Sequence, residues 1–215
     1  MRVSSSNHRL ATAGLILAAL FTSACGDVAR SGRGPAYLII VALEGASGAK
    51  PDEFGTTVAS DVVTLVEQDI NGTKVRVPTV YGDPGKVTFR LGLKDPGPAA
   101  TPTTPGPLND VTVNRYRVVY KRADGRNTQG VDVPYGFDGA FTVTVRGSGP
   151  SEAGFDLVRI AAKIEPPLAN LRGFGGAQFI GTIADITFYG RDQAGNEVSA
   201  TGSMSVSFAD YGDPQ

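Results

Sequence analysis

The side chains best suited to ligand chemistry gather in a polar segment over residues 123–138. The candidates share carboxylate, carboxamide or aromatic side chains: Asp124, Asn127, Asp132, Tyr135, Phe137 and Asp138. Their oxygens could hold Ca²⁺, and their rings could contact an organic ligand on a loop. The spacing differs from that of an EF-hand, however, and Asp and Asn also make local hydrogen bonds in turns. We favour this second interpretation, in which the two rings cover one end of the fold.

The residue types on which most enzymes rely are scarce. His8 is the only histidine, Cys25 is the only cysteine, and tryptophan is absent. A chain cleaved before Cys25 would have no histidine for Ser-His-Asp or Cys-His catalysis, for zinc or for haem. An enzyme would then depend on carboxylates, but no pair of acids stands out. We predict a non-catalytic protein without metal or cofactor; the alternative is a carboxylate-dependent hydrolase of envelope or extracellular glycans.

The N-terminal segment predicts export from a bacterial cell. Arg2 and Arg9 precede an apolar run over residues 10–21, and small residues lead from there to Cys25. This order is typical of a signal peptide. The run is too short for a membrane-spanning helix, which needs about 20 apolar residues.

The sequence LFTSAC, which ends at Cys25, resembles a lipobox, the site where bacterial lipoproteins are acylated and cleaved. The resemblance implies a signal peptide over residues 1–24, and a mature protein that begins with lipidated, palmitate-bearing Cys25. The polar, glycine-rich residues 25–35 predict a flexible tether, which leaves residues 36–215 for the folded domain. In bacteria that sort lipoproteins by the residue after the cysteine, Gly26 implies the outer membrane.

The charge balance argues against a nucleic-acid partner. The chain has 20 basic and 21 acidic residues, and loss of Arg2 and Arg9 with the signal peptide would increase the acidic excess. The sequence contains neither a basic excess nor a basic stripe. The expected partners are therefore the membrane, through the lipid, and other envelope proteins.

From residue 36 onward, apolar and polar residues alternate with the period of a β-strand. About nine strands are predicted, over residues 36–43, 61–70, 73–81, 86–94, 111–122, 140–146, 157–164, 184–190 and 196–208. This pattern predicts an all-β protein with an antiparallel, immunoglobulin-like β-sandwich; a closed barrel is the alternative. The proline-rich segment 95–110 is interpreted as a surface loop of one domain rather than as a linker between two.

Two local patterns make sharper predictions. The dipeptide Asn71-Gly72 predicts a two-residue hairpin turn, which would place Asp69 opposite Lys74. The apolar phase shifts by one residue near Asn114, which predicts a β-bulge.

Three further expectations concern burial. The run over 36–43 is expected to be buried on both faces of its sheet. The strand over 157–164 should turn Ile160 and Ile164 into the core, ahead of a short helix within 165–173. Asp185 lies in an apolar run between Ile183 and Ile186, which makes it the one acid that burial could adapt to catalysis. The alternative is a charge that protects an edge strand from pairing with another sheet.

The closing segment ITFYGRDQAGNEVSATGSMSVSF resembles the last two strands of bacterial immunoglobulin-like and fibronectin type III-like domains, with their D-x-A-G-N turn at Asp192 to Asn196. Over most of residues 36–214 the chain is similar to a group of exported bacterial lipoproteins. They share the segments GAKPDEFGTTVASDVV, RADGRNTQGVDVPYGFDGAFTVTV and TFYGRDQAGNEVSATGSMSVSFADYGDP. The resemblance implies a β-sandwich and no activity. We expect a binding or assembly module of the cell envelope, or a structural component of it.

Replacing Cys25 with Ser should release the protein from the membrane fraction, because the lipid chains supply the anchor and each buried CH₂ contributes about 0.8 kcal/mol. Fractionation of cells followed by immunoblotting measures this. The matched control is Ser31→Ala, which changes the predicted tether and leaves the acylation site intact. A Cys25→Ser protein that still sediments with the envelope would show that the lipid is not the anchor.

Overall fold

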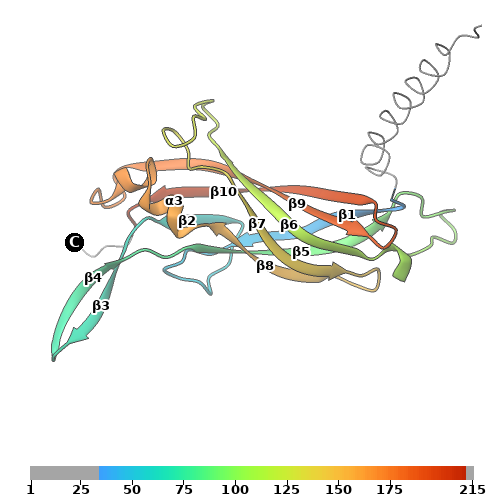
Figure 1. The fold of residues 1–215 in the computed structure, drawn as a ribbon, viewed down its shortest axis with the longest axis horizontal. Helices are drawn as coiled ribbons and strands as arrows, with labels where there is room; N and C mark the ends of the chain where they lie inside the picture. The colour runs from blue at the N-terminus through green and yellow to red at the C-terminus, as the bar shows by residue number, and fades with distance from the viewer. Residues whose placement is uncertain (1–33, 212–215) are drawn as a thin grey trace, which may run out of the picture.

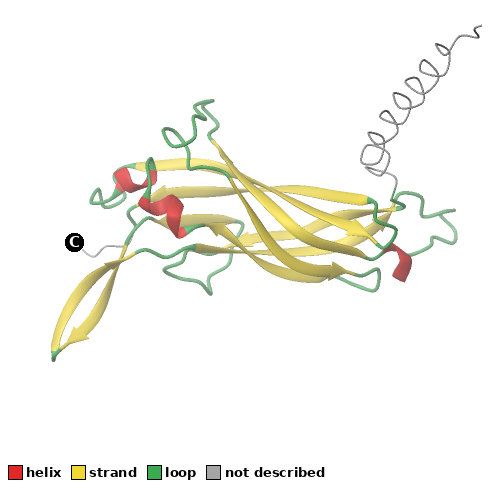
Figure 2. Ribbon diagram, viewed as in Figure 1, coloured by secondary structure: helices red, strands yellow, loops and turns green. Residues whose placement is uncertain are grey.

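The structure is a computed structural model that describes residues 34–211. The predicted signal peptide, Cys25, Gly26 and most of the predicted tether lie outside these residues. Within the described part, strands make up most of the regular structure (Figure 2), and ten of them lie in three sheets. The protein is therefore all-β. Among residues 34–211, no helix is both long and apolar enough to cross a membrane.

The smaller main sheet has three antiparallel strands in the order β1-β5-β8. Strand β1 spans Ala36–Gly45, β5 spans Asp83–Leu93, and β8 spans Ser151–Val158. One face of this sheet carries buried side chains such as Phe89 and Phe155. This face supplies one side of the core.

The larger sheet has the order β2-β10-β9-β6-β7 and curls around the core (Figure 1). Its strands are β2 (Thr57–Asp61), β10 (Glu197–Ala209), β9 (Phe179–Asp192), β6 (Val111–Lys121) and β7 (Phe137–Val145). All neighbours are antiparallel except β2, which runs parallel to β10.

Two strands and three short helices lie outside these sheets. Strands β3 (Thr64–Ile70) and β4 (Thr73–Thr79) form a hairpin that projects from the body (Figure 1). The helices are η1 (Pro107–Asn109), α3 (Ile160–Ile164) and η2 (Leu168–Leu171).

The core lies between the two main sheets and centres on Phe188 of β9. Its ring meets Phe89 of β5 at 5.0 Å and Phe155 of β8 at 5.5 Å between centroids, both edge to face. Tyr116 of β6 packs against Phe155 at 5.3 Å. Such edge-to-face pairs add about 0.5–1.5 kcal/mol beyond the area they bury.

Two tyrosines of β6 also make polar contacts across the core. The Tyr120 hydroxyl donates to the Leu157 carbonyl of β8 at 2.6 Å, and the Tyr116 hydroxyl accepts from the Asp156 amide at 3.0 Å. Burial strongly raises the pKa of Tyr120, so that its proton stays available for this bond. The two sheets are therefore joined by hydrogen bonds as well as by apolar contact.

The hairpin turn and the bulge are confirmed. Asn71 and Gly72 both have positive φ, as a type I′ turn requires, and Asp69 pairs with Lys74 in the register. The side chains pair differently: Asp69 accepts a hydrogen bond from the Gly72 amide, and Lys74 contacts Glu67. The register of β6 shifts between Val113 and Arg115 against both of its neighbours, which is the predicted bulge.

Most predicted strands are confirmed, but several expectations about burial, strand bounds and sheet position are wrong. Strand β1 is not buried on both faces, because Tyr37 and Val41 are exposed. The predicted strand 61–70 is divided between β2 and β3. Asp185 does not lie on an edge strand, since β9 has a neighbour on each side. Its carboxylate instead contacts Lys121 and Ser203 on the outer face of the sheet.

The largest difference is at residues 157–164. Strand β8 ends at Val158, and the chain continues into helix α3, where Ile160 and Ile164 are exposed and Lys163 is buried. The alternating apolar pattern is therefore misleading here, because a buried polar contact of Lys163 decides the conformation. The short helix expected within 165–173 is present as η2.

Replacing Phe188 with Ala should lower the free energy of unfolding by about 3–5 kcal/mol, because it leaves a cavity among four aromatic rings. The matched control is Phe179→Ala on the same strand, whose ring is exposed. That change should cost no more than about 0.5 kcal/mol. Urea unfolding of both variants measures the difference, and equal losses would contradict this account of the core.

Candidate functional site

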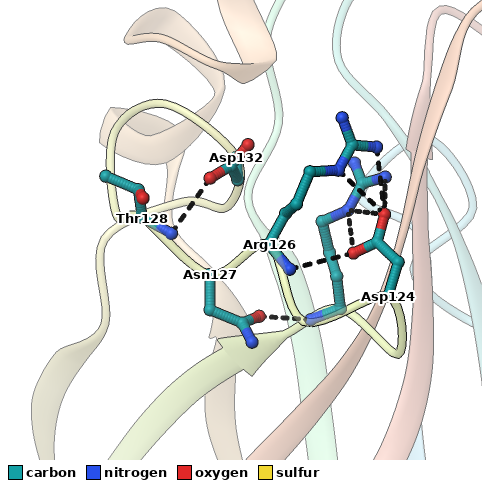
Figure 3. Close-up of polar contacts among 6 residues, drawn as sticks. Asp124, Arg126, Asn127, Thr128 and Asp132 are labelled. Carbon is teal, nitrogen blue, oxygen red and sulfur yellow. Dashed lines mark hydrogen bonds and ion pairs between the residues drawn. The ribbon is translucent and has the colours of Figure 1, made fainter.

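The polar loop between β6 and β7 covers residues 122–136 and is organised around the carboxylate of Asp124 (Figure 3). Arg122 donates to both oxygens of this carboxylate, the shortest contact being 2.7 Å. Arg126 donates to it from its guanidinium at 3.0 Å and from its amide at 3.1 Å. Hydrogen bonds and charge from Arg122, and then those from Arg126, hold the pKa of Asp124 far below its usual range.

The other polar candidates of the loop also bond within it. The Asn127 side-chain oxygen accepts the Arg122 amide at 2.6 Å, and the Asp132 carboxylate accepts the Thr128 amide at 3.1 Å (Figure 3). Gly125 and Gly130 have positive φ, which allows the tight turns between these contacts. The polar residues therefore shape the loop, as the turn interpretation predicts.

The aromatic candidates have different surroundings. Phe137 is buried as the first residue of β7, packs against Tyr116 at 6.1 Å, and lies 4.1 Å beneath the Arg159 guanidinium. Tyr135 lies over Gly130 and is 53% exposed, and Val131 nearby in the sequence is 68% exposed. The loop thus covers one end of the core through Phe137 and presents Tyr135 and Val131 to solvent.

Asp138 belongs to another cluster. It lies on the outer face of β7, where it pairs with Arg115 and Arg117 of β6 at 3.2 and 3.1 Å. Arg115 also stacks on Tyr189 at 4.0 Å. The six candidates therefore do not converge on one ligand position. Among residues 34–211, no three His, Cys, Asp or Glu side chains are grouped to hold a metal ion.

The most buried charged cluster in the described chain has no signature in the sequence. The Lys163 ammonium of α3 lies 2.7 Å from the Asp83 carboxylate of β5, and both side chains are almost fully buried. The Ser60 hydroxyl and the Gly48 amide donate to the same carboxylate. No local sequence pattern predicts contacts between positions so far apart along the chain.

A groove of about 490 Å³ opens beside this cluster, and two carboxylates line it. Glu53 is exposed and bonded to Lys50 at 3.2 Å. Asp61 accepts the Thr64 hydroxyl at 2.6 Å and the Tyr211 amide at 2.8 Å. The groove thus carries two carboxylates, the side chains on which a glycosidase relies, but both are engaged by protein groups.

Comparison of the chain with protein-family models, with curated proteins and with solved structures found no match. The resemblance to exported lipoproteins and to immunoglobulin-like domains therefore stays a prediction.

The Asp124 carboxyl should remain ionised at pH 4, where an ordinary aspartate is about half protonated. A carboxyl whose pKa is lowered by folding stabilises the folded state at pH values above its ordinary pKa. This contribution is lost as the pH falls through the lowered pKa. An NMR titration of the carboxyl carbon measures this. The double variant Arg122→Gln, Arg126→Gln should raise the midpoint towards the ordinary value. A wild-type midpoint near pH 4 would contradict the arrangement.

Proposed function

We propose that the protein is a lipid-anchored module of the cell envelope, in the outer membrane, that binds or assembles with other envelope proteins without catalysing a reaction. The single observation that carries this proposal is the loop 122–136, in which Tyr135 and Val131 face solvent on a frame of local ion pairs and hydrogen bonds. Exposed aromatic side chains on such loops are typical of recognition surfaces.

The internal bonding of the loop favours binding for an energetic reason. Association costs about 0.5–1.5 kcal/mol for each flexible side chain that must be immobilised. In this loop the Gly136 amide donates to the Gln129 side-chain oxygen at 3.3 Å, and the Gly130 amide donates to the Val133 carbonyl at 2.8 Å, so the backbone around Tyr135 is already bonded within the loop. A partner would therefore spend little of its contact energy on ordering the loop.

The position of the loop relative to the predicted anchor also favours this function. Gly34, the first described residue, lies beside the Asp192–Asn196 turn, and β6 begins opposite Asp192. The loop follows the other end of β6, about 35 Å away for 11 residues at 3.3 Å per residue. A tether on residue 34 would thus hold one end near the membrane and present the loop at the other (Figure 1).

For the fold we propose an immunoglobulin-like sandwich in which the larger sheet is strongly curled. Two mostly antiparallel sheets that face each other across a common aromatic core support this assignment. Such scaffolds carry their recognition surfaces on loops at the ends of the sheets, where loop 122–136 lies.

A second candidate function, hydrolysis of envelope or extracellular glycans, is favoured by the groove that Glu53 and Asp61 line. It requires that one acid be released from its protein partners when substrate binds. We rank it below binding because Asp61 accepts hydrogen bonds on both carboxylate oxygens.

A photoreactive phenylalanine analogue at position 135 should form a covalent adduct with an envelope protein in living cells, because this side chain would lie in the interface. The matched control is the same analogue at position 37: Tyr37 is similarly exposed and also lies over a glycine, but belongs to the tethered end. Illumination followed by immunoblotting and mass spectrometry measures both. Absence of an adduct at 135, or equal adducts at both positions, would contradict the assigned surface. If the protein hydrolyses glycans and Glu53→Gln abolishes this activity, the assigned function would be hydrolysis instead of binding.

A further inference from the structure

The buried pair Lys163 and Asp83 brings an amine against a carboxyl group in an apolar interior. The Lys163 nitrogen lies 2.7 Å from Asp83 Oδ1, and the two side chains are 1% and 0% exposed. The carboxyl carbon is one bond beyond that oxygen. The amine is therefore close to the separation of about 3–3.5 Å at which reacting groups attack each other.

Each of the two groups is held in place by further hydrogen bonds. The Lys163 amine also donates to the Asp61 carbonyl at 2.8 Å, which fixes the end of its flexible chain. Asp83 Oδ1 accepts the Gly48 amide at 2.7 Å, and Oδ2 accepts the Ser60 hydroxyl. Donors thus reach both oxygens of the carboxyl while the nitrogen is held beside it.

Burial favours the uncharged form of Lys163. Desolvation lowers the pKa of Lys163, and the nearby Asp83 carboxylate opposes this change. Transfer of one proton from the ammonium to the carboxylate turns the ion pair into a neutral amine beside a neutral acid. These are the forms in which an amine attacks a carboxyl carbon.

We propose that Lys163 and Asp83 become joined by an intramolecular amide bond. The Lys163 nitrogen uses its lone pair to attack Asp83 Cγ, forming the C–N bond. The C–Oδ2 bond then breaks, and Oδ2 leaves as water. Of the three protons of the ammonium group, one stays on the amide nitrogen and two leave with the water, so that atoms and charges balance without another reagent.

The donors around Asp83 suit the two oxygens to different roles in this step. The Gly48 amide is placed to stabilise negative charge that develops on Oδ1. The Ser60 hydroxyl donates to Oδ2 and is placed to assist the departure of this oxygen as water. Ser47 and Asp61, the neighbours of these donors in the chain, line the 490 Å³ groove, through which the water can leave.

The bond would give the fold a covalent connection that cysteine cannot provide, since Cys25 is the only cysteine in the chain. It would join the start of β5 to α3 across 80 positions of sequence. Covalent closure of a long loop stabilises a fold by restricting the unfolded chain, as a disulfide does.

Peptide mass spectrometry of the full chain, purified from membranes and denatured, tests the proposal. We expect one branched peptide pair that contains Lys163 and Asp83 and is lighter than the two separate peptides by the mass of one water. Lys163 should also resist cleavage by trypsin and modification by an amine-reactive label. The matched control in the same sample is Lys121 with Asp185, which has the same 2.7 Å separation but is exposed. It should remain unlinked.

Asp83→Asn adds a chemical check. An asparagine at this position would release ammonia instead of water, so that the linked variant should have the same mass as the linked wild-type chain. Wild-type peptides that retain the water, with Lys163 free to take the label, would overturn the proposal and leave an ion pair only. This result is read on denatured wild-type protein, so a variant that fails to fold does not affect it.

Discussion

The contact between Lys163 and Asp83 is the constraint on which much of this fold depends. Burying two charged groups costs several kcal/mol each, unless hydrogen bonds replace the lost water. Here those bonds come from Gly48 and Ser60 to the carboxylate, and from the amine to the Asp61 carbonyl. Helix α3, the end of β2, the start of β5 and the loop after β1 must therefore meet at one point. The conversion of the predicted strand 157–164 into a strand and a helix follows from this requirement.

On the outer face of the larger sheet, in contrast to the buried cluster, the charged pairs are exposed to solvent. Exposed pairs across neighbouring strands, such as Lys121 with Asp185 and Arg191 with Glu197, lie in water and each contributes about 0–1 kcal/mol. These contacts help to define the register, since Asp185 of β9 meets Lys121 of β6 on one side and Ser203 of β10 on the other only in one alignment of the three strands. The buried cluster selects the fold, whereas the surface pairs adjust the alignment of strands that the core already holds.

The sequence predicts the features that depend on neighbours along the chain. Alternation gives most strands, Asn71-Gly72 gives a turn and a register, and the phase shift near Asn114 gives a bulge. In the candidate site, the local bonds of Asp124, Asn127 and Asp132 are the turn contacts expected of these residue types. The predictions that fail depend on contacts between distant parts of the chain. A lysine is expected on the polar surface, and nothing near Lys163 in the sequence reveals an acid 80 positions away. Likewise, Asp138 lies near the loop candidates in the sequence, but the strand turns it to the other face.

The buried cluster and the candidate recognition loop are connected through a short series of contacts. Phe137, which directly follows the loop, lies beneath Arg159, the residue that precedes α3. Lys163, one turn further on, is held by Asp83. The end of the loop thus rests on a helix that is fixed to the core at its other end. A loop with a fixed base loses less conformational entropy when it binds, and this benefits exposed anchors such as Tyr135. The costly burial of a charged pair at this end of the molecule therefore has a physical use beyond stability: it keeps the base of the loop rigid.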